Sequence, residues 1–458
     1  MISKKSSLMV GVSGIRGIVG ETLTPEVISC FGAAFGTYMN SGRVVVGRDT
    51  RVSGPMIKHL ILGSLTAAGC EVIDLGIVTT PTCSLMAKEF KAAGAVIITG
   101  SHNPVEWNAL KFLKTGGLFL NEKEGLRLLE IYNNGVFKQA RWDGLRTERE
   151  DSSGAEKHLK KILANIDVKL IRKKRFKVTL DSCNGAGSLI TQLLLKELGC
   201  QVIPINCKPD GLFPHNPEPI SANLQELCKK VKTTGSDAGF AQDPDADRLA
   251  IIDSNGRYIG EEYSVALAAD YLLKNTNNAT VVVNMSTSMA LDDIAKKHKA
   301  RLVRTKVGEV HVAERMIAEK ALIGGEGNGG VMWPQIHPVR DSLAGISLTL
   351  QNMAENNKTI TELAAALPAY YIVKEKISCN PKNVKTVMTE IKKFYSNEKV
   401  ETIDGITITG DKTRISVRPS NTEPIFRIFA ESDSLKKSED IAQNIKKIMT
   451  GILKKLAD

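Results

Sequence analysis

Aromatic residues and long apolar runs are scarce in this chain of 458 residues. Aromatics make up 5% of it, and no segment resembles an aromatic RNA-binding motif. The longest apolar runs, such as Ala95–Thr99 and Ala279–Val283, are far shorter than the roughly 20 residues of a membrane helix. Glycine and serine at positions 11, 13 and 14 interrupt any apolar stretch behind Lys4 and Lys5, so no leader peptide is visible. We therefore expect a cytoplasmic chain that binds neither nucleic acid nor membrane.

The cysteines form no recognisable site. None of the eight belongs to a CxxC pair, and their spacing is not typical of metal ligands. Several lie in apolar stretches, where a reduced cysteine behaves as a small hydrophobic residue. This distribution agrees with a reducing compartment.

The residues that are abundant point to a folded protein with a basic surface. Hydrophobic residues make up 42% and charged residues 24%, as in soluble globular proteins. The length predicts about three domains. The net charge of +11 comes largely from dispersed lysine-rich runs, which we interpret as solvated surface. A basic balance also suits a small anionic substrate.

Strands and helices alternate in a pattern that occurs three times. In each copy, a β-branched strand precedes a helical stretch, a second strand and a third strand of small or apolar residues. The first strands are Val44–Val46, Val178–Leu180 and Val281–Val283; the second are Glu71–Leu75, Gln201–Ile205 and Arg301–Thr305; the third are Ala95–Thr99, Ala238–Gln242 and Ala321–Gly324. Each third strand leads into an unusual polar loop. Because ligands of open α/β sheets bind beyond the carboxyl ends of strands, we expect the loops to meet in one cleft.

The last part of the chain departs from this pattern. From Ile372 to Asp458 the order is strand, helix, strands and helix, which predicts an α+β domain. The predicted fold class is therefore α/β, with three similar α/β domains and a C-terminal α+β domain. The predicted boundaries are 1–153, 154–255, 256–370 and 371–458.

The first polar loop is Gly100-Ser101-His102-Asn103-Pro104. A tight turn projects the Ser101 hydroxyl away from regular backbone hydrogen bonding, as a nucleophile or phosphate carrier requires. Serine is a weak nucleophile and needs a base or a metal ion. His102 is adjacent, and Lys111 could act as general base if a positive environment lowered its pKa. Taken alone, the segment favours an ordinary serine turn.

The second loop, Asp243-Pro244-Asp245-Ala246-Asp247-Arg248, places three carboxylates at alternate positions. Such anions repel one another unless a divalent cation binds, and all-oxygen ligation suits Mg²⁺. The spacing imitates an EF-hand, but Arg248 stands where that loop needs glycine, and Ser254 where it needs a bidentate carboxylate. We expect one Mg²⁺ ion, with a solvated acidic loop as the alternative.

The third loop, Gly325-Glu326-Gly327-Asn328-Gly329-Gly330, matches GxGxxG, but no helical segment follows it. The chain also has no GxxxxGK[ST] segment, so neither a dinucleotide fold nor a P-loop is indicated. The acid Glu326 and the amide Asn328 suit hydrogen bonds to sugar hydroxyls. A simple glycine-rich turn is about equally consistent with this loop alone.

The fourth loop spans Arg418–Pro424 and concentrates hydrogen-bond donors. Guanidinium, hydroxyl and backbone N–H groups together favour phosphate capture over a plain polar hairpin tip. The donors are Arg418, Ser420, Asn421 and Thr422, with Arg427 three residues beyond the loop. A hydroxyl carrier, a Mg²⁺ site, a sugar loop and a phosphate clamp together indicate phosphoryl transfer to a phosphorylated polyol.

With these four loops, in this order and spacing, the chain resembles the α-D-phosphohexomutase superfamily over essentially its whole length. Gly14-Ile15-Arg16-Gly17 also looks like the N-terminal signature of that superfamily. The resemblance implies an isomerase with four domains around a central cleft, of which the first three share one α/β topology with mixed sheets.

The resemblance also implies roles for the loop residues. Ser101 would be phosphorylated, and that phosphate would bind Mg²⁺ together with Asp243, Asp245 and Asp247. Arg16 and Arg248 would face the transferring phosphoryl group, while His102 and Lys111 assist proton transfer. Glu326 and Asn328 would hold sugar hydroxyls. The phosphate that does not react would bind Arg418, Ser420, Asn421, Thr422 and Arg427.

The implied reaction passes through a hexose bisphosphate, which is also the expected activator. Phosphorylated Ser101 donates its phosphoryl group to a sugar 1- or 6-phosphate, the bisphosphate turns over, and Ser101 takes back the other group. The expected partners are small hexose or hexosamine phosphates, and the chain is expected to be a monomer or a homodimer.

The sugar loop departs from the pattern of many superfamily members, which have Ser and His where this chain has Asn328 and Gly330. Glu309 also stands where some relatives carry His. The loop and the Ser13–Gly17 start look most like phosphoglucosamine mutase-type members, so we expect glucosamine phosphates as substrates. The alternatives are a phosphomannomutase or phosphoglucomutase of broad hexose specificity, a silent sugar-phosphate-binding protein, and a Mg²⁺-dependent phosphatase.

Overall fold

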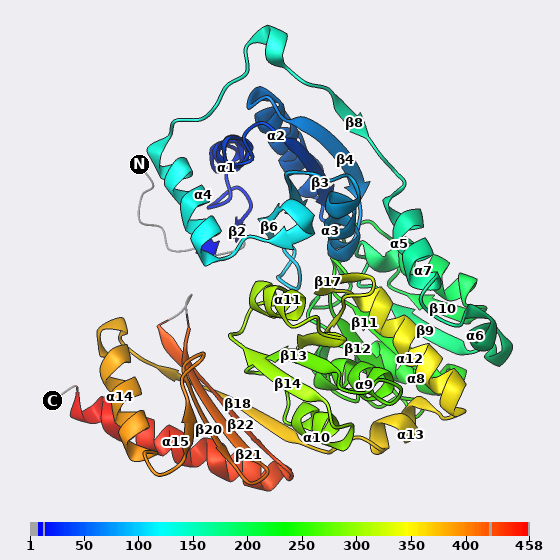
Figure 1. The fold of residues 1–458 in the computed structure, drawn as a ribbon, viewed down its shortest axis with the longest axis vertical. Helices are drawn as coiled ribbons and strands as arrows, with labels where there is room; N and C mark the ends of the chain where they lie inside the picture. Colours follow the sequence, from blue (N-terminus) through cyan, green and yellow to red (C-terminus); the bar gives the residue numbers. More distant parts are fainter. Residues whose placement is uncertain (1–7, 12–13, 421–423, 457–458) are drawn as a thin grey trace. The chain divides into compact units, whose positions relative to one another are not determined.

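A computed structural model describes residues 8–11, 14–420 and 424–456. The chain packs into two compact units (Figure 1). The first unit contains the chain up to Ala268 together with Asn328–Ala364, and the second contains Ala269–Gly327 and the chain from Ala365. The four-domain boundaries stay a prediction. Among the described residues, no helix combines the length and the apolar character that a bilayer crossing requires.

The first sheet has eight strands, seven of them in the order β1-β2-β6-β5-β3-β4-β8. Its parallel centre consists of β4 (Glu71–Ile77), β3 (Arg43–Arg48) and β5 (Gly94–Ile98), and β6 (Trp107–Lys114) runs antiparallel to β5. The other strands are β1 (Met9–Gly11), β2 (Gly14–Ile18), β7 (Leu118–Phe119) and β8 (Glu148–Glu150). Buried side chains of α1 (Pro25–Tyr38), α2 (Gly54–Ala67) and α4 (Glu122–Asn134) join those of the strands in one core.

The second and third sheets repeat the centre of the first. Strand β9 (Lys177–Asp181) lies between β10 (Gln201–Ile205) and β11 (Ala238–Gln242), both parallel to it, and β12 (Leu249–Ile252) is antiparallel to β11. In the third sheet, β13 (Thr280–Asn284) lies between β14 (Arg301–Thr305) and β15 (Ile323–Glu326), again in parallel. That sheet continues with the antiparallel pair β16 (Gly330–Trp333) and β17 (His337–Arg340). The threefold pattern of mixed α/β sheets is therefore confirmed.

The third strand of the third copy lies later in the chain than the sequence pattern predicted. Strand β15 ends at Glu326, inside the predicted loop, because Gly324 and Gly325 continue the ladder beside Val282 and Val283 of β13. A Cβ atom on Gly324 would lie 2.3 Å from the carbonyl oxygen of Val282. Glycine therefore permits this close pairing, and Glu326 ends the strand instead of lying in a free loop.

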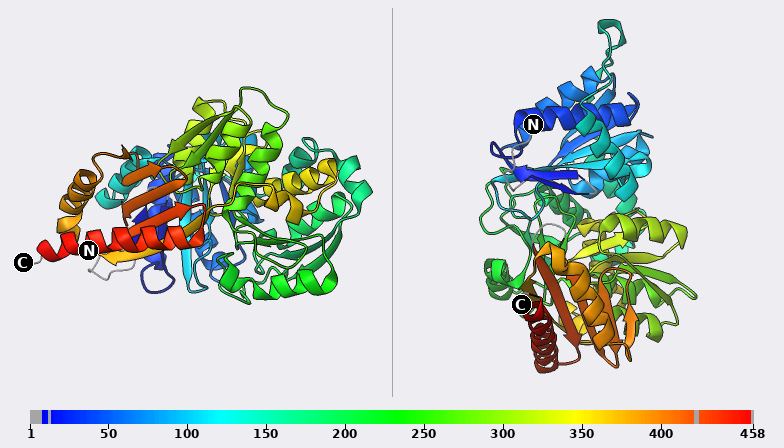
Figure 2. Two further views of the ribbon diagram at one scale, coloured as in Figure 1. Left: turned by 90° about the horizontal axis from the view of Figure 1, so that it is seen from below. Right: turned by 90° about the vertical axis from the view of Figure 1, so that its left-hand side faces the viewer.

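The C-terminal sheet is antiparallel throughout, in the order β18-β22-β21-β20-β19. Its strands are β18 (Tyr371–Ser378), β19 (Lys399–Glu401), β20 (Ile406–Gly410), β21 (Thr413–Pro419) and β22 (Ile425–Ser432). Helices α14 (Val384–Phe394) and α15 (Leu435–Lys455) pack on one face, where Phe426 and Ile428 meet Ile445 and Met449. Figure 2 shows α15 running along this sheet. The α+β prediction is confirmed.

The remaining helices connect or cover the strands. They are α3 (Thr80–Glu89), α5 (Gly154–Leu163), α6 (Val168–Lys174), α7 (Gly187–Glu197), α8 (Gln225–Thr234), α9 (Glu262–Leu273), α10 (Ala290–Lys297), α11 (Glu309–Ala318), α12 (Ser342–Asn356) and α13 (Ile360–Ala365). All eight cysteines are free thiols.

Candidate active site

The turn after β5 holds Ser101 in a strained conformation. Ser101 has a φ of +49°, in the left-handed region that a residue with a side chain rarely adopts. Its backbone N–H donates to Thr99 Oγ1 over 2.9 Å, and Thr99 donates to Asp49 over 2.6 Å. Only 3% of Ser101 is exposed. The fold therefore fixes the position of this residue, and its role as a nucleophile or carrier stays a prediction.

Arg51 stabilises the same turn through hydrogen bonds and was not predicted from the sequence. Its guanidinium is fully buried and donates to the carbonyl oxygens of Ser101, Asn103, Pro104 and Trp107 at 2.7 to 2.9 Å. It also pairs with Asp49 at 3.2 Å. Burial raises the pKa of Asp49, although Arg51 opposes that shift. The Asp49–Arg51 segment directly follows β3, so the rule about strand ends could have drawn attention to it.

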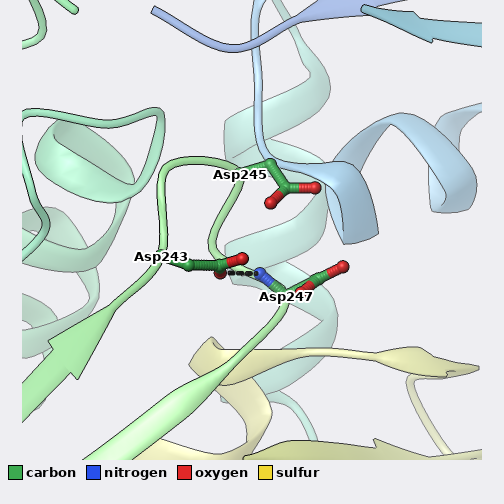
Figure 3. A group of neighbouring side chains, drawn as sticks. All are labelled: Asp243, Asp245 and Asp247. Carbon is green, nitrogen blue, oxygen red and sulfur yellow. Dashed lines mark hydrogen bonds between the residues drawn. The ribbon is translucent and has the colours of Figure 1, made fainter. Parts of the chain in front are cut away.

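The acidic loop joins β11 to β12 and gathers its three carboxylates (Figure 3). Asp243, Asp245 and Asp247 are fully buried, and ligand oxygens of the three lie within 4.8 Å of one another. Asp243 Oδ1 accepts from the backbone N–H groups of Asp247 and Arg248 at 3.2 and 3.1 Å. Its other oxygen accepts from Ser101 Oγ at 2.9 Å. The structure thus joins the serine loop to the acidic loop.

The carboxylate set fits a hard divalent cation. Asp245 Oδ1 and Asp247 Oδ1 are buried and have no hydrogen-bond partner. Burial raises the pKa of Asp243 well above its ordinary value, and the charges of Asp247 and Asp245 raise it further. A bound Mg²⁺ ion would relieve this repulsion and ligate the two oxygens that lack partners.

Lys111 lies in the site, but in an environment opposite to the one that a general base would need. Its ammonium group is 2.7 Å from Asp245 Oδ2 and 3.6 Å from Asp247 Oδ2. Burial acts to lower the pKa of Lys111, but the two carboxylates outweigh it and raise the pKa. The premise of a positive environment was therefore wrong, because the sequence did not reveal that β6 lies beside the acidic loop.

His102 lies close to the serine hydroxyl, with its Nδ1 3.4 Å from Ser101 Oγ. Burial lowers the pKa of His102 to about 2, and the charges of Arg248 and Arg16 contribute. Arg16, on β2, donates to Asn103 Oδ1 at 2.6 Å. Arg248 is 8% exposed and lies 3.7 Å from Glu218. The first unit therefore brings together the predicted serine, imidazole, three carboxylates, lysine and two arginines.

Two further side chains of this unit were missed as functional candidates. Thr80, at the start of α3, donates to Asp245 Oδ2 at 2.6 Å. Arg340, at the end of β17, donates to Asp247 Oδ2 at 2.6 Å. Neither lies in a recognisable motif, and both reach the aspartates only through the fold. Asn328 of the glycine-rich loop also belongs to this unit, and its Oδ1 is buried without a hydrogen-bond partner.

Glu326 belongs to the second unit, as does Arg418, which begins the predicted phosphate loop Arg418–Pro424 (the arginine loop). The backbone at Val307 and Gly308 connects these two residues. Glu326 is 5% exposed and accepts from Asn284 and from the Gly308 N–H at 2.8 and 3.1 Å. The neighbouring Val307 N–H donates to Asp404, which also pairs with Arg418 at 3.1 Å. Asp404 was not predicted, since no motif surrounds it.

The C-terminal sheet aligns cations beside the predicted phosphate loop. Strand register places Arg418 opposite Arg427, and Arg427 opposite Lys376. Like charges in directly opposed positions repel, so an anion bound there would stabilise the row. Ser420 donates its backbone N–H to Ile425. Asn421 and Thr422 lie outside the described residues.

The fold and the site together define the chain as a multidomain α/β protein with a buried serine–carboxylate centre. Family models for phosphoglucomutase/phosphomannomutase match it in order: α/β/α domain I at residues 7–139, domain II at 156–256, domain III at 261–371 and the C-terminal domain at 353–448. The chain belongs to this family, within the α-D-phosphohexomutase superfamily, and is a phosphohexomutase, an isomerase.

Several relatives match nearly the whole chain. A "Phosphoglucomutase/phosphomannomutase" of Thermococcus kodakarensis is 40% identical over 97% of this chain and 99% of its own length. A "Probable phosphoglucosamine mutase" of Methanopyrus kandleri is 35% identical over 94% of this chain and 95% of its own length. The expected phosphohexomutase class is confirmed, and the names of the relatives divide between hexose and hexosamine.

Solved structures share the fold. A phosphoglucomutase/phosphomannomutase family protein of Burkholderia thailandensis has a TM-score of 0.86 and 25% identity, covering 97% of this chain and 98% of its own. The N-acetylphosphoglucosamine mutase of Aspergillus fumigatus, solved with GlcNAc-6P and magnesium, has a TM-score of 0.64 and 16% identity. Its alignment covers 98% of this chain and 97% of its own.

Proposed function

We propose that the chain interconverts glucosamine 6-phosphate and glucosamine 1-phosphate through a phosphoserine at Ser101 and a bisphosphate intermediate. One observation carries the proposal: the buried Ser101 hydroxyl lies 2.9 Å from Asp243, within a triad that fits Mg²⁺. A phosphoryl group on Ser101 would thus lie at the metal ligands. The magnesium complex of the Aspergillus structure supports the same ion for this chain.

The transfer exchanges one phosphorus–oxygen bond for another. The bond from phosphorus to Ser101 Oγ breaks as a bond to the attacking sugar hydroxyl oxygen forms. The proton of the sugar hydroxyl passes to the His102 ring, and the ring releases a proton to Ser101 Oγ. The ring therefore carries no net charge after the transfer. The 3.4 Å separation between His102 Nδ1 and Ser101 Oγ supports this proposed role.

Charge around the moving phosphoryl group is balanced by cations of the first unit. Arg16 and Arg248 are proposed to face it, and the ammonium group of Lys111 stays paired with Asp245. Asp243, Asp245 and Asp247 would hold Mg²⁺, which when bound would stabilise the phosphoryl oxygens as a Lewis acid. After the first transfer, the bisphosphate turns over and returns its other phosphoryl group to Ser101.

The non-reacting phosphate is assigned to the arginine loop, with Arg418, Ser420, Asn421, Thr422 and Arg427 as its ligands. The aligned cations of the C-terminal sheet support this assignment. Glu326 and Asn328 are assigned to the sugar hydroxyls. A hexose bisphosphate is proposed as activator, since it can phosphorylate Ser101. The monomer or homodimer state and the cytoplasmic location stay predictions from the sequence.

A second candidate is phosphoglucomutase and phosphomannomutase activity of broad hexose specificity. The observation that favours it is the name of the 40% identical relative. Glucosamine phosphate is preferred because the 35% identical Methanopyrus relative is named for that sugar and because the glycine-rich loop resembles such members.

Phosphorus NMR can separate these candidates. The purified chain would receive Mg²⁺, a trace of glucose 1,6-bisphosphate, and either glucosamine 6-phosphate, glucose 1-phosphate or mannose 1-phosphate. We expect the fastest interconversion with glucosamine 6-phosphate. Faster hexose turnover would favour the second candidate, and release of inorganic phosphate in place of interconversion would indicate a phosphatase.

A further inference from the structure

We propose that Arg340 is a positioning residue for the metal ligand Asp247, and that Gly330 provides the space that the Arg340 side chain occupies. The inference rests on the Mg²⁺ site of the proposed function. It connects a residue of the glycine-rich loop to the geometry of the acidic loop, within one compact unit.

The first observation is the way in which each aspartate is held. Arg340 Nη2 donates to Asp247 Oδ2 at 2.6 Å, and Thr80 and Lys111 occupy the corresponding Oδ2 of Asp245. The Oδ1 atoms of both aspartates remain buried without a hydrogen-bond partner. Each carboxylate is thus fixed through one oxygen and presents the other, which is the arrangement that partners of metal ligands impose.

The second observation explains the glycine at position 330. A Cβ atom there would lie 2.3 Å from Arg340 Cδ and 2.8 Å from Arg340 Cγ. Gly330 is not among the glycines with positive φ, so its backbone does not require glycine. Glycine at position 330 therefore leaves room for the Arg340 side chain. Any larger residue would displace the Arg340 stem and withdraw its guanidinium from Asp247.

A charge effect of Arg340 and a positioning effect of Arg340 would change the metal affinity in opposite directions, so an experiment can separate them. A cation next to a metal site repels the metal, so removing Arg340 would tighten metal binding if charge dominated. If Arg340 orients Asp247, its removal would instead weaken binding, because a free carboxylate must be ordered when the ion binds. Partners of metal ligands typically contribute about 10-fold or more to affinity.

The test measures binding of Mn²⁺ to the purified full chain by electron paramagnetic resonance of the free ion. We expect Arg340→Ala and Gly330→Ala each to weaken Mn²⁺ binding by about 10-fold. Arg340→Lys should have an intermediate effect, because it keeps the charge but loses the planar fork. Controls are Arg172→Ala, at an exposed ion pair, and Gly63→Ala, whose Cβ would meet open space.

The double variant Arg340→Ala/Gly330→Ala tests the spatial link. With the Arg340 stem removed, Gly330→Ala should cause almost no further loss, so the two effects should not add. Full additivity, or unchanged or tighter Mn²⁺ binding in Arg340→Ala, would overturn the inference while the metal site stands. Absence of Mn²⁺ binding in the unmodified chain would instead overturn the metal site, and this inference with it.

Discussion

At the scale of single residues, the Ser101 turn depends on a side chain 50 positions earlier in the sequence. Arg51 satisfies four carbonyl oxygens of the turn region and the buried Asp49 carboxylate at once. The Ser101 hydroxyl is therefore positioned by a buried charge and not by the short Gly-Ser-His-Asn-Pro sequence alone. Such placement matters because small displacements of a reacting group reduce rates strongly.

Arg51→Lys is expected to keep the charge but lose most of the carbonyl contacts, since an ammonium group lacks the planar fork of guanidinium. We expect kcat to fall by about 100-fold, as for a misplaced nucleophile. Steady-state kinetics and thermal unfolding would be measured together. Unchanged kcat in a folded Arg51→Lys variant would show that the turn keeps its geometry without this brace.

At the scale of elements, a buried ion pair connects the C-terminal sheet to the loop after β13. Glu431 of β22 pairs with Arg414 of β21 at 2.7 Å and accepts from Ser288 and the Met289 N–H. Arg414 also donates to the Thr287 carbonyl oxygen. These residues belong to the second compact unit, and both charged groups are nearly fully buried.

Glu431→Ala would leave Arg414 buried without its carboxylate. We expect the free energy of unfolding to fall by about 3–5 kcal/mol, the usual cost of an uncompensated buried charge. Glu375→Ala is a matched control, because it breaks a more exposed pair with Lys446 and should cost about 1 kcal/mol or less. Thermal unfolding would compare them, and equal effects would contradict the assigned role.

The elements themselves could be predicted well from the sequence because local pattern determines them. The β-branched strands and helix-ending glycines such as Gly69 and Gly199, both with positive φ, carry their own signals. Contacts between loops that are distant in the sequence leave no such local signal. Thr80 and Asp245 lie 165 positions apart, and Lys111 and Asp245 lie 134 apart. The anionic surroundings of Lys111 and the position of Arg340 therefore required the three-dimensional structure.

At the scale of the whole molecule, the residues assigned to chemistry and those assigned to phosphate binding belong to different compact units. Ser101 and the three aspartates are in the first unit, while Arg418 and Arg427 are in the second. This division predicts that substitutions in the two sets should affect different kinetic constants.

Arg418→Ala should mainly raise the KM for both sugar phosphates, by about 10-fold or more, since a charge-assisted hydrogen bond to a phosphate is lost. Arg315→Ala is the control, because Arg315 is an exposed arginine of the same unit that pairs with Glu319. Steady-state kinetics in both directions would measure the change. An unchanged KM for both substrates would remove Arg418 from the proposed clamp.

The central claim is that Ser101 carries the transferred phosphoryl group, and its most direct measurement combines mass spectrometry with turnover. The chain and its Ser101→Ala variant would be incubated with Mg²⁺ and glucose 1,6-bisphosphate, mapped for phosphopeptides, and assayed for mutase activity. We predict one phosphate on Ser101 of the unmodified chain, none in the folded variant, and almost complete loss of turnover. Substantial mutase activity in Ser101→Ala, or a phosphate on another residue that turns over with substrate, would contradict the account.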